Sequence, residues 1–210
     1  MGSKGWQSTL APLRQQGHEV IVVDGGSRDA TVALATPHAD HVITSPRGRA
    51  RQMNAGATLA QGDVLLFLHA DTALPHHAEG LVTAAVQQGT RWGRFDVHIT
   101  GGAALFPMIA RLMNLRSRLS GIATGDQAIF VERLLFVQLG GYADQPLMED
   151  IELSRRLRAV ARPACLQQQV RTSGRRWLQR GVWRTIFLMW RLRWRYWRGD
   201  APEALARAYR

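Results

Sequence analysis

The stretch that most constrains the fold is a short apolar run that ends abruptly in polar residues. Val64 to Leu68 is too short to span a membrane and suits a strand buried on both faces. His69-Ala70-Asp71-Thr72 follows at once, and Pro75 stands where a helix would begin. Open α/β sheets bind ligands at the carboxyl ends of their strands. Asp71 is therefore a candidate metal ligand, with turn capping as the alternative.

Two similar units precede this one. Glu19–Val23 is an apolar strand that leads through Asp24-Gly25-Gly26-Ser27 into a helix ending near Ala35. Asp40–Thr44 is a strand that leads into a helix over Gly48–Leu59. Strands and helices that alternate at this spacing predict an α/β fold, with a mostly parallel sheet and helices on both faces.

The remaining segments are assigned from the same periodicities. Pro107 falls inside an apolar helical stretch and is expected to kink it. We expect one domain over residues 1–174 and a helical segment over residues 175–210. The other expected elements are helices over 8–16, 75–88, 103–119 and 148–160, and strands over 92–99 and 125–131.

The chain is strongly basic. Lys and Arg number 27 against 16 Asp and Glu, and the net charge is +11. Such a charge suits nucleic acid, an acidic membrane surface or phosphate-bearing substrates, and an arginine-rich coding bias would also produce it. Charge alone does not choose among these.

Few features point outside the cytoplasm. Cys165 is the single cysteine, which excludes an internal disulfide and a multi-cysteine metal site. No run reaches the roughly 18 apolar residues of a spanning helix. Met1–Lys4 is not followed by the apolar segment of a secretory leader. The expected location is the cytoplasm, including the inner face of the cell membrane.

Acidic residues stand at the ends of the predicted elements. Asp24 comes directly off a strand, and its loop does not match the G-x-G-x-x-G dinucleotide fingerprint. An Asp there can hydrogen-bond a nucleobase or ribose, or cap the turn. Glu149 and Asp150 fall in the first turn of a helix, where they can serve as a general base or stabilise the helix dipole.

Three arginines cluster where the second strand unit turns into its helix, namely Arg47, Arg49 and Arg51. Guanidinium forks match phosphate oxygens, and a helix N-terminus adds a positive field. The cluster predicts phosphate binding, and a solvated basic turn is the alternative.

Six motifs follow one another along the chain: Asp24-Gly-Gly-Ser-x-Asp-x-Thr, Arg51-x-x-Asn54-x-Gly56, His69-Ala70-Asp71, Gly125-Asp126-Gln127, Met148-Glu149-Asp150 and Arg175-Arg176-Trp177. Each is weak alone, but their order resembles the family 2 glycosyltransferases with the GT-A fold, in particular a small bacterial branch. The resemblance covers residues 8 to 210. It implies transfer of a sugar from a nucleotide-diphosphate donor to an acceptor hydroxyl, with inversion at the sugar carbon.

The resemblance also implies a role for each motif. Asp150, beside Glu149, would be the base that deprotonates the acceptor. Asp71, together with His69, would hold Mn²⁺ or Mg²⁺ across the diphosphate. The residues implied to bind the nucleotide-sugar are Asp24, Gly25, Arg47, Arg51, Asn54, Ala70, Asp71, Asp126, Arg176 and Trp177.

Three departures from the family pattern stand out. His69 replaces the first Asp of the D-x-D motif. Ser173 stands where the family has the Gln that precedes Arg-Trp by three residues. The resemblance also implies an apolar strand ahead of the helix at Ser8, where this chain has none. That strand would lie centrally and line the nucleotide pocket. We therefore expect that the given sequence begins after it, that the protein has lost part of its donor site, or that another chain supplies the missing edge.

The C-terminal segment is basic and aromatic. Trp183, Phe187, Trp190, Trp194 and Trp197 are spaced 4, 3, 4, 3 and form one helical stripe. An arginine follows four of these residues directly. Such a helix suits an interface with anionic lipid heads, which a lipid-linked acceptor would favour. Packing of the stripe on the domain, or on a second copy in a homo-oligomer, is the alternative.

Other functions fit less of the sequence. A sugar nucleotidyltransferase would carry a Gly-rich basic loop near its start, which is absent here. A nucleic-acid-binding protein would explain the charge and the tail but not the acidic residues at element ends, so nucleic acid is disfavoured as a partner. A catalytically inactive glycosyltransferase-like scaffold stays open because of the missing first strand.

Overall fold

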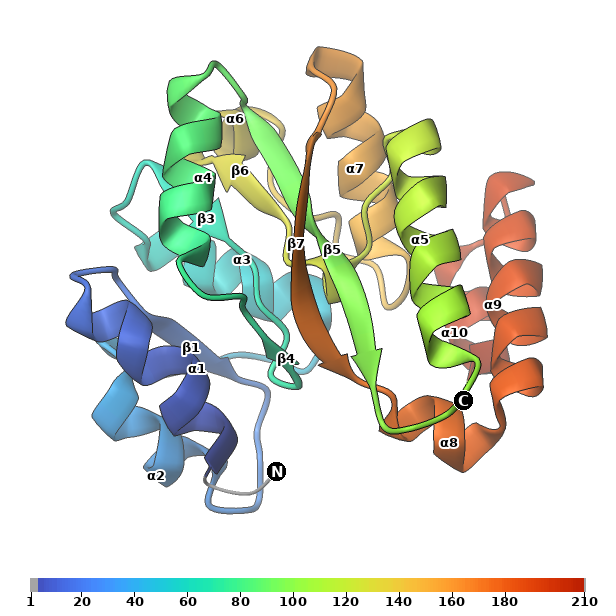
Figure 1. Cartoon of the computed structure of the whole chain (residues 1–210), viewed down its shortest axis with the longest axis horizontal. Helices are drawn as coiled ribbons and strands as arrows, with labels where there is room; N and C mark the ends of the chain where they lie inside the picture. Colours follow the sequence, from blue (N-terminus) through green and yellow to red (C-terminus); the bar gives the residue numbers. More distant parts are fainter. Residues whose placement is uncertain (1–3, 210) are drawn as a thin grey trace.

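A computed structural model describes residues 4–209 (Figure 1). Met1–Ser3 and Arg210 lie outside this range. The prediction that no secretory leader begins at Met1 therefore falls mainly on residues that the structure does not describe. The predicted helices and strands are present within a few residues of their expected bounds, except that the segment predicted as a strand over 125–131 begins with a 3-10 turn and becomes a strand only at Phe130. The helices are α1 Lys4–Gln15, α2 Thr31–Ala35, α3 Arg49–Leu59, α4 Ala78–Gln87, α5 Phe106–Ser120, α6 Arg133–Gln138, α7 Glu149–Val160, α8 Arg175–Arg180, α9 Val182–Trp197 and α10 Pro202–Tyr209, with short 3-10 turns η1 Thr36–His38 and η2 Gly125–Gln127. The strands are β1 Ile21–Asp24, β2 His41–Thr44, β3 Val64–Leu66, β4 Thr72–Ala73, β5 Trp92–Thr100, β6 Phe130–Glu132 and β7 Ala164–Ser173.

The strands form two sheets. β1 pairs in parallel with β2, and the other five strands form a sheet in the order β3-β6-β5-β7-β4. Only β5 and β7 are parallel in the larger sheet, because β6 runs antiparallel to both of its neighbours and β4 runs antiparallel to β7. The prediction of a mostly parallel sheet is therefore wrong in this detail, and the sheet is mixed.

Helices cover both faces of the larger sheet, as predicted. One apolar core joins β5, β6 and β7 to α4 and α5. A second core joins β3 and β6 to α3, α6 and α7. β5 lies between them and is buried from Trp92 to Val97, including Arg94 and Asp96, which pair with each other. Burial on both faces is typical of a strand at the centre of a sheet covered by helices.

β1 and β3 are not hydrogen-bonded to each other, although both run beside α3. A cavity of about 1170 Å³ lies between the two sheets, and residues of β1, β3, α1, α3 and α4 line it. Its walls are largely apolar, with Leu10, Ile21, Val23, Leu65 and Phe67 among them. The two sheets are thus separated by this cavity within residues 4–209.

Pro107 does not kink α5. The helix begins at Phe106, so Pro107 occupies its first turn, where the missing backbone N–H has no intrahelical partner to lose. The expected kink is wrong because the helix starts three residues later than predicted.

The C-terminal segment folds as three helices rather than one. Gly181 separates α8 from α9 with a positive φ of 83°, which favours glycine. α10 packs against α9 through Leu192 and Leu205, both fully buried. None of the helices within residues 4–209 combines the length and the apolar character that a bilayer span requires.

Candidate active site

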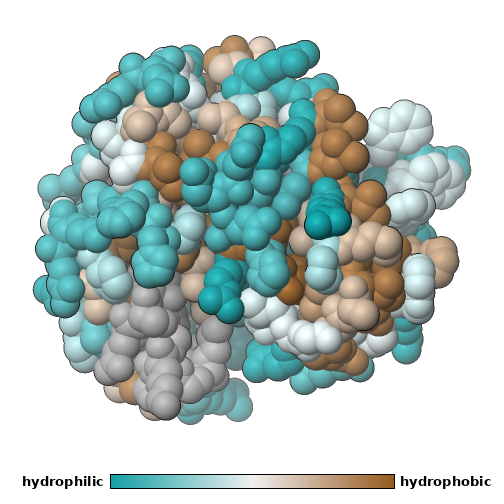
Figure 2. Space-filling view, viewed as in Figure 1, coloured by the Kyte–Doolittle hydropathy of each residue, from teal (hydrophilic) through white to brown (hydrophobic). Residues whose placement is uncertain are grey.

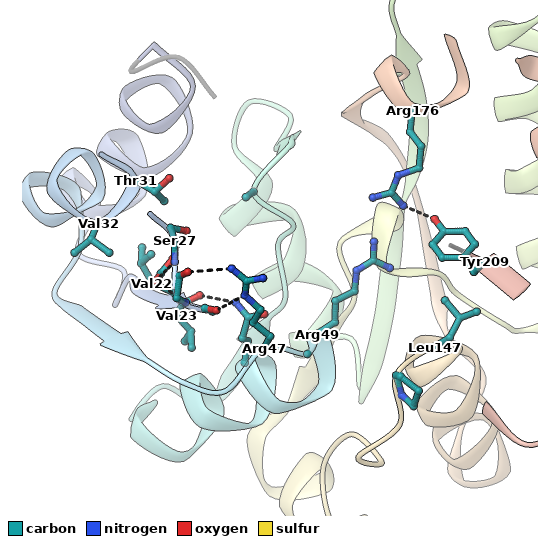
Figure 3. Close-up of a pocket in the computed structure, with 17 residues that line it drawn as sticks. Val22, Val23, Ser27, Thr31, Val32, Arg47, Arg49, Leu147, Arg176 and Tyr209 are labelled. Carbon is teal, nitrogen blue, oxygen red and sulfur yellow. Dashed lines mark hydrogen bonds between the residues drawn. The ribbon is translucent and has the colours of Figure 1, made fainter. Parts of the chain in front are cut away.

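A pocket of about 560 Å³ opens between the β1–α2 loop, the start of α3 and the end of α10 (Figure 3). It brings together segments that are far apart in sequence. Five of the predicted nucleotide-sugar residues line it, namely Asp24, Gly25, Arg47, Ala70 and Arg176. Arg49, which belongs to the arginine cluster predicted to bind phosphate, lines it as well. Gln52, Leu147 and Tyr209 also line it and were not singled out from the sequence.

Asp24 shapes the loop at the end of β1. Its Oδ2 accepts hydrogen bonds from the backbone N–H groups of Gly26 and Ser27, both at 2.8 Å, and its Oδ1 accepts one from the Ser27 hydroxyl at 2.5 Å. The bonds from Ser27 hold the pKa of Asp24 below its usual value. The capping role foreseen from sequence is therefore present, and the carboxylate stays ionised at the pocket wall.

Arg47 fastens the start of α3 to this loop. Its Nε donates to the Gly25 carbonyl at 3.2 Å and its Nη2 to the Gly26 carbonyl at 3.3 Å. Gly48 caps the helix with a φ of 146°, which turns the chain sharply before Arg49. Arg47 and Arg49 consequently face the pocket from adjacent positions (Figure 3).

Arg49 is the electrostatic centre of the site. Its Nη1 lies 3.7 Å from Glu149 Oε1, and its side chain remains 45% exposed. Partial burial lowers the pKa of Arg49, but Glu149, Asp126 and Asp150 together raise it further, above its ordinary value. Arg49 therefore stays charged and links the pocket to the acidic N-terminus of α7.

Two of the predicted residues are engaged elsewhere. Arg51 Nε donates to Asp144 Oδ1 at 2.8 Å on the surface. Asn54 exchanges two hydrogen bonds with the backbone of Tyr142, donating at 2.8 Å and accepting at 2.9 Å. Both side chains attach α3 to the loop before α7, and neither lines the pocket.

His69 and Asp126 face each other across the end of β3. His69 Nδ1 lies 3.6 Å from Asp126 Oδ1, and His69 Nε2 is buried without a hydrogen-bond partner in residues 4–209. A Cβ on Gly125 would lie 2.4 Å from Nε2 of His69, so a larger residue at this position would clash with the imidazole. Burial raises the pKa of Asp126, but His69, Arg49 and Arg176 lower it further, below its usual value.

His69 and Asp71 suit a metal ion that is also bound by the substrate better than a metal ion held by protein side chains alone. No group of three His, Cys, Asp or Glu side chains within residues 4–209 is arranged to hold a metal alone. Asp71 is exposed, and it lines the larger cavity together with His69. One carboxylate and one unpaired imidazole nitrogen fit a divalent cation whose other ligands come from a bound diphosphate.

The two carboxylates at the start of α7 differ in environment. Glu149 is 2% exposed, and burial together with Asp150 raises its pKa. Asp150 is less buried, and its Oδ2 accepts the Gly125 N–H at 2.8 Å while its Oδ1 accepts the Ile151 N–H at 2.7 Å. Met148, just before them, has a φ of 67°, a strained conformation for a non-glycine residue. Neither carboxylate lines the pocket.

The predicted Arg-Trp pair divides into two roles. Arg176 Nη1 donates to the Tyr209 hydroxyl, and its guanidinium lies 5.7 Å from the centroid of that ring. Arg180 holds the other end of the same residue, donating to the Tyr209 carbonyl at 2.8 Å. Trp177 instead packs on the core beside β5 and α5. Figure 3 shows Arg49 and Arg176 extending toward the same space, with Tyr209 beside them.

Sequence reasoning missed two arginines behind Asp150. Arg116 of α5 and Arg193 of α9 have buried guanidinium nitrogens with no hydrogen-bond partner among the described residues. Burial and the charge of Arg193 lower the pKa of Arg116 to about 10, and burial lowers that of Arg193, while Asp150 opposes both shifts. No motif marks them, because each is one arginine among several on an amphipathic helix.

Comparisons with known proteins concern the family and the fold. Residues 7–131 match the protein family described as Glycosyl transferase family 2. No curated protein matches the chain. Two solved structures of S. aureus TarS superpose with TM-scores of 0.63 and 0.64 at 17% and 15% identity, each over 81% of this chain. The mannosyltransferase PcManGT from Pyrobaculum calidifontis, solved with GDP-Man and Mn²⁺, superposes with a TM-score of 0.62 at 17% identity over 99% of this chain.

These structures are longer than the chain described here. The chain spans 57% and 34% of the two TarS structures and 66% of the mannosyltransferase. At these identities the likeness shows the fold alone. That fold is the mixed α/β arrangement of the GT-A glycosyltransferases, as the sequence predicted.

Proposed function

We propose, because this chain belongs to glycosyl transferase family 2, that it transfers a sugar from a nucleotide-diphosphate donor to an acceptor hydroxyl with inversion. The observation that carries the proposal is one pocket that holds Asp24 and three arginines, Arg47, Arg49 and Arg176. Asp24 and Arg47 lie at the β1–α2 loop, and Arg49 and Arg176 lie at the other side of the pocket, which matches a nucleoside joined to a diphosphate.

The donor would extend from the Asp24 loop to Arg49 and Arg176. The nucleoside belongs beside the Asp24 loop, whose glycines let a ligand approach the backbone. The diphosphate belongs between Arg49 and Arg176, where two charges on separate elements meet. Arg51 and Asn54 contribute by fixing α3, since their side chains already bind Asp144 and Tyr142.

A divalent cation, Mn²⁺ or Mg²⁺, would be held by Asp71 and His69. Asp126 would orient the His69 ring through its Nδ1 side, which leaves Nε2 for the cation. When bound, such a cation supplies charge neutralisation for the departing diphosphate. The presence of Mn²⁺ with GDP-Man in the P. calidifontis mannosyltransferase supports this assignment by analogy of fold.

Asp150 is the proposed general base. It is ionisable, less buried than Glu149, and held in one orientation by the N–H groups of Gly125 and Ile151. It would take the proton from the acceptor hydroxyl as that oxygen attacks the sugar carbon and the bond to the diphosphate breaks. Glu149 would serve by positioning Arg49.

Nucleotide binding is the direct test. UDP or GDP, or the corresponding nucleotide-sugar, at 100 times its dissociation constant should stabilise the fold by about 2.7 kcal/mol. For a chain of 210 residues this raises the melting temperature by about 5 to 10 °C. Thermal-shift titrations with Mn²⁺ or with EDTA measure both the nucleotide preference and the metal dependence.

Variants assign the shift to this pocket. Arg49→Gln should remove most of it, and Asp71→Ala should remove its dependence on Mn²⁺. Arg28→Gln is the matched control, since Arg28 belongs to the β1–α2 loop beside the pocket but does not line it. No shift with any nucleotide, or an equal shift in Arg49→Gln, would contradict the proposed donor site.

Tyr209 should compete with the diphosphate for Arg176. Tyr209→Phe removes one hydrogen bond to Arg176, worth about 1 kcal/mol, and should tighten nucleoside-diphosphate binding about fivefold. Calorimetric titration with GDP or UDP measures the change. Tyr196→Phe serves as control, because its hydroxyl bonds Gln145 instead. Weaker binding in Tyr209→Phe would mean that this hydroxyl contacts the donor itself.

A further inference from the structure

α9 presents its aromatic stripe to solvent. Trp183, Phe187, Trp190, Trp194 and Trp197 are between 54% and 82% exposed. The opposite side of the helix carries the buried contacts, through Thr185 and Leu192. The stripe therefore does not pack on the rest of the described chain. Of the partners considered from the sequence, a membrane surface and a second copy of the chain are left.

α5 carries a second exposed stripe that the sequence analysis did not identify. Met108, Leu112, Leu115 and Leu119 are spaced 4, 3 and 4, and are between 44% and 80% exposed. This spacing places them on one side of the helix, away from the buried Phe106, Ile109 and Ala110. Aliphatic side chains of this size are rarely left in water as a continuous row.

The two stripes belong to one side of the molecule. Arg116 of α5 and Arg193 of α9 are close enough for the charge of one to lower the pKa of the other. α5 and α9 lie next to each other at the right of Figure 1, and Figure 2 shows hydrophobic side chains over α5 beside pale side chains projecting at the edge where α9 lies. We call these two stripes together the α5/α9 face.

The charged residues that border the α5/α9 face are arginines. Neither helix contains Asp or Glu, and Arg111 of α5 is exposed. Of the other arginines in these helices, Arg116 and Arg193 have buried guanidinium nitrogens, and Arg118 and Arg195 pair with Asp96 and Asp200. Arg184 and Arg191 are exposed beside the aromatic stripe, and Arg198 stacks 4.7 Å from the centroid of the Trp194 ring. Apolar side chains bordered by arginines match a bilayer surface, where the apolar groups enter the acyl boundary and the guanidiniums meet anionic headgroups.

Other occupants fit this face less well. A second copy using the same face would bring arginines of one protomer against those of the other. Nucleic acid would match the arginines and tryptophans but would leave the aliphatic row of α5 without an apolar partner. We propose that the α5/α9 face docks the protein onto an anionic lipid bilayer.

Vesicle binding tests the proposal. The full chain should sediment with vesicles of phosphatidylcholine and phosphatidylglycerol, and about tenfold less with phosphatidylcholine alone. Added salt should weaken the binding, and the tryptophan emission should shift to shorter wavelength on the mixed vesicles. Emission is a direct probe here because four tryptophans lie on the stripe.

Two double variants test whether vesicle binding depends on the α5/α9 face or on exposed apolar side chains in general. Phe187→Ser with Trp190→Ser should lower vesicle binding about tenfold and leave nucleotide binding unchanged. Leu134→Ser with Val137→Ser is the control, since these two α6 residues are 67% and 63% exposed but lie outside the face. The proposal is overturned by equal loss in both pairs, by binding to DNA or RNA in preference to the mixed vesicles, or by a dimer that buries the stripe tryptophans without lipid.

Discussion

Asp150→Asn should lower kcat for sugar transfer by about 100- to 10,000-fold while leaving the dissociation constant of the nucleotide nearly unchanged. The amide keeps the size of the carboxylate but cannot take a proton from the acceptor. Donor binding should persist because the pocket is lined by Arg49 and Arg176, and not by Asp150. Single-turnover measurement of sugar transfer, together with nucleotide titration, separates the two effects.

Two controls make this result specific. Glu152→Gln removes a carboxylate from the same first turn of α7, but Glu152 pairs with Arg156 and lies on another side of the helix. Its kcat should stay within about threefold of the native value. The Asp150→Asn substitution would turn an amide donor toward the Gly125 or Ile151 N–H, so the melting temperature must be measured as well. Full activity in a folded Asp150→Asn variant would exclude Asp150 as the base.

Glu149→Gln should behave differently, because Glu149 is proposed to act through Arg49. Loss of its charge frees Arg49 from the 3.7 Å pair, so nucleotide binding should change more than kcat. This split between binding and turnover distinguishes a positioning residue from a general base.

The limits of prediction from sequence are clearest at the arginine cluster. Arg47, Arg49 and Arg51 are equivalent in the sequence, and helix geometry alone places Arg47 and Arg51 on one side. The chain turns at Gly48, which lies outside helical geometry, so Arg47 and Arg49 both face the pocket and Arg51 reaches Asp144. The position of the 140–147 loop, which is distant in sequence, decides that Arg51 reaches Asp144 and not the pocket.

β7 shows a second limit. Its residues 164–173 include three consecutive glutamines and alternate poorly, so the segment was not predicted as a strand. It is a strand because β5 and β4 supply hydrogen bonds on both of its sides. Long-range pairing of this kind overrides local propensity. The apolar strands and the residues at their ends were predictable because burial on both faces leaves a local signature.

The cavity between the two sheets leads to the second large prediction. A short apolar strand joined to the N-terminus should raise the melting temperature by about 10 °C. The cavity between β1 and β3 is lined by apolar side chains, and strands β1 and β3 have no strand partner within residues 4–209 on the edges that face it. Three or four buried Val or Ile side chains would contribute about 1.5 to 3 kcal/mol each, before the cost of ordering the added segment.

The design is a segment of about six residues rich in Val and Ile, a common strand length, joined through a flexible linker to the start of α1. The control carries the same segment with a central proline, which cannot donate to either neighbouring strand. Thermal unfolding of both fusions measures the gain, and nucleotide titration asks whether the added strand also tightens donor binding at the Asp24 loop. A strand that fills the cavity stabilises the first fusion only. Equal melting temperatures for the two fusions would mean that the space between β1 and β3 does not accept a strand, and that the two sheets are stable as separate units.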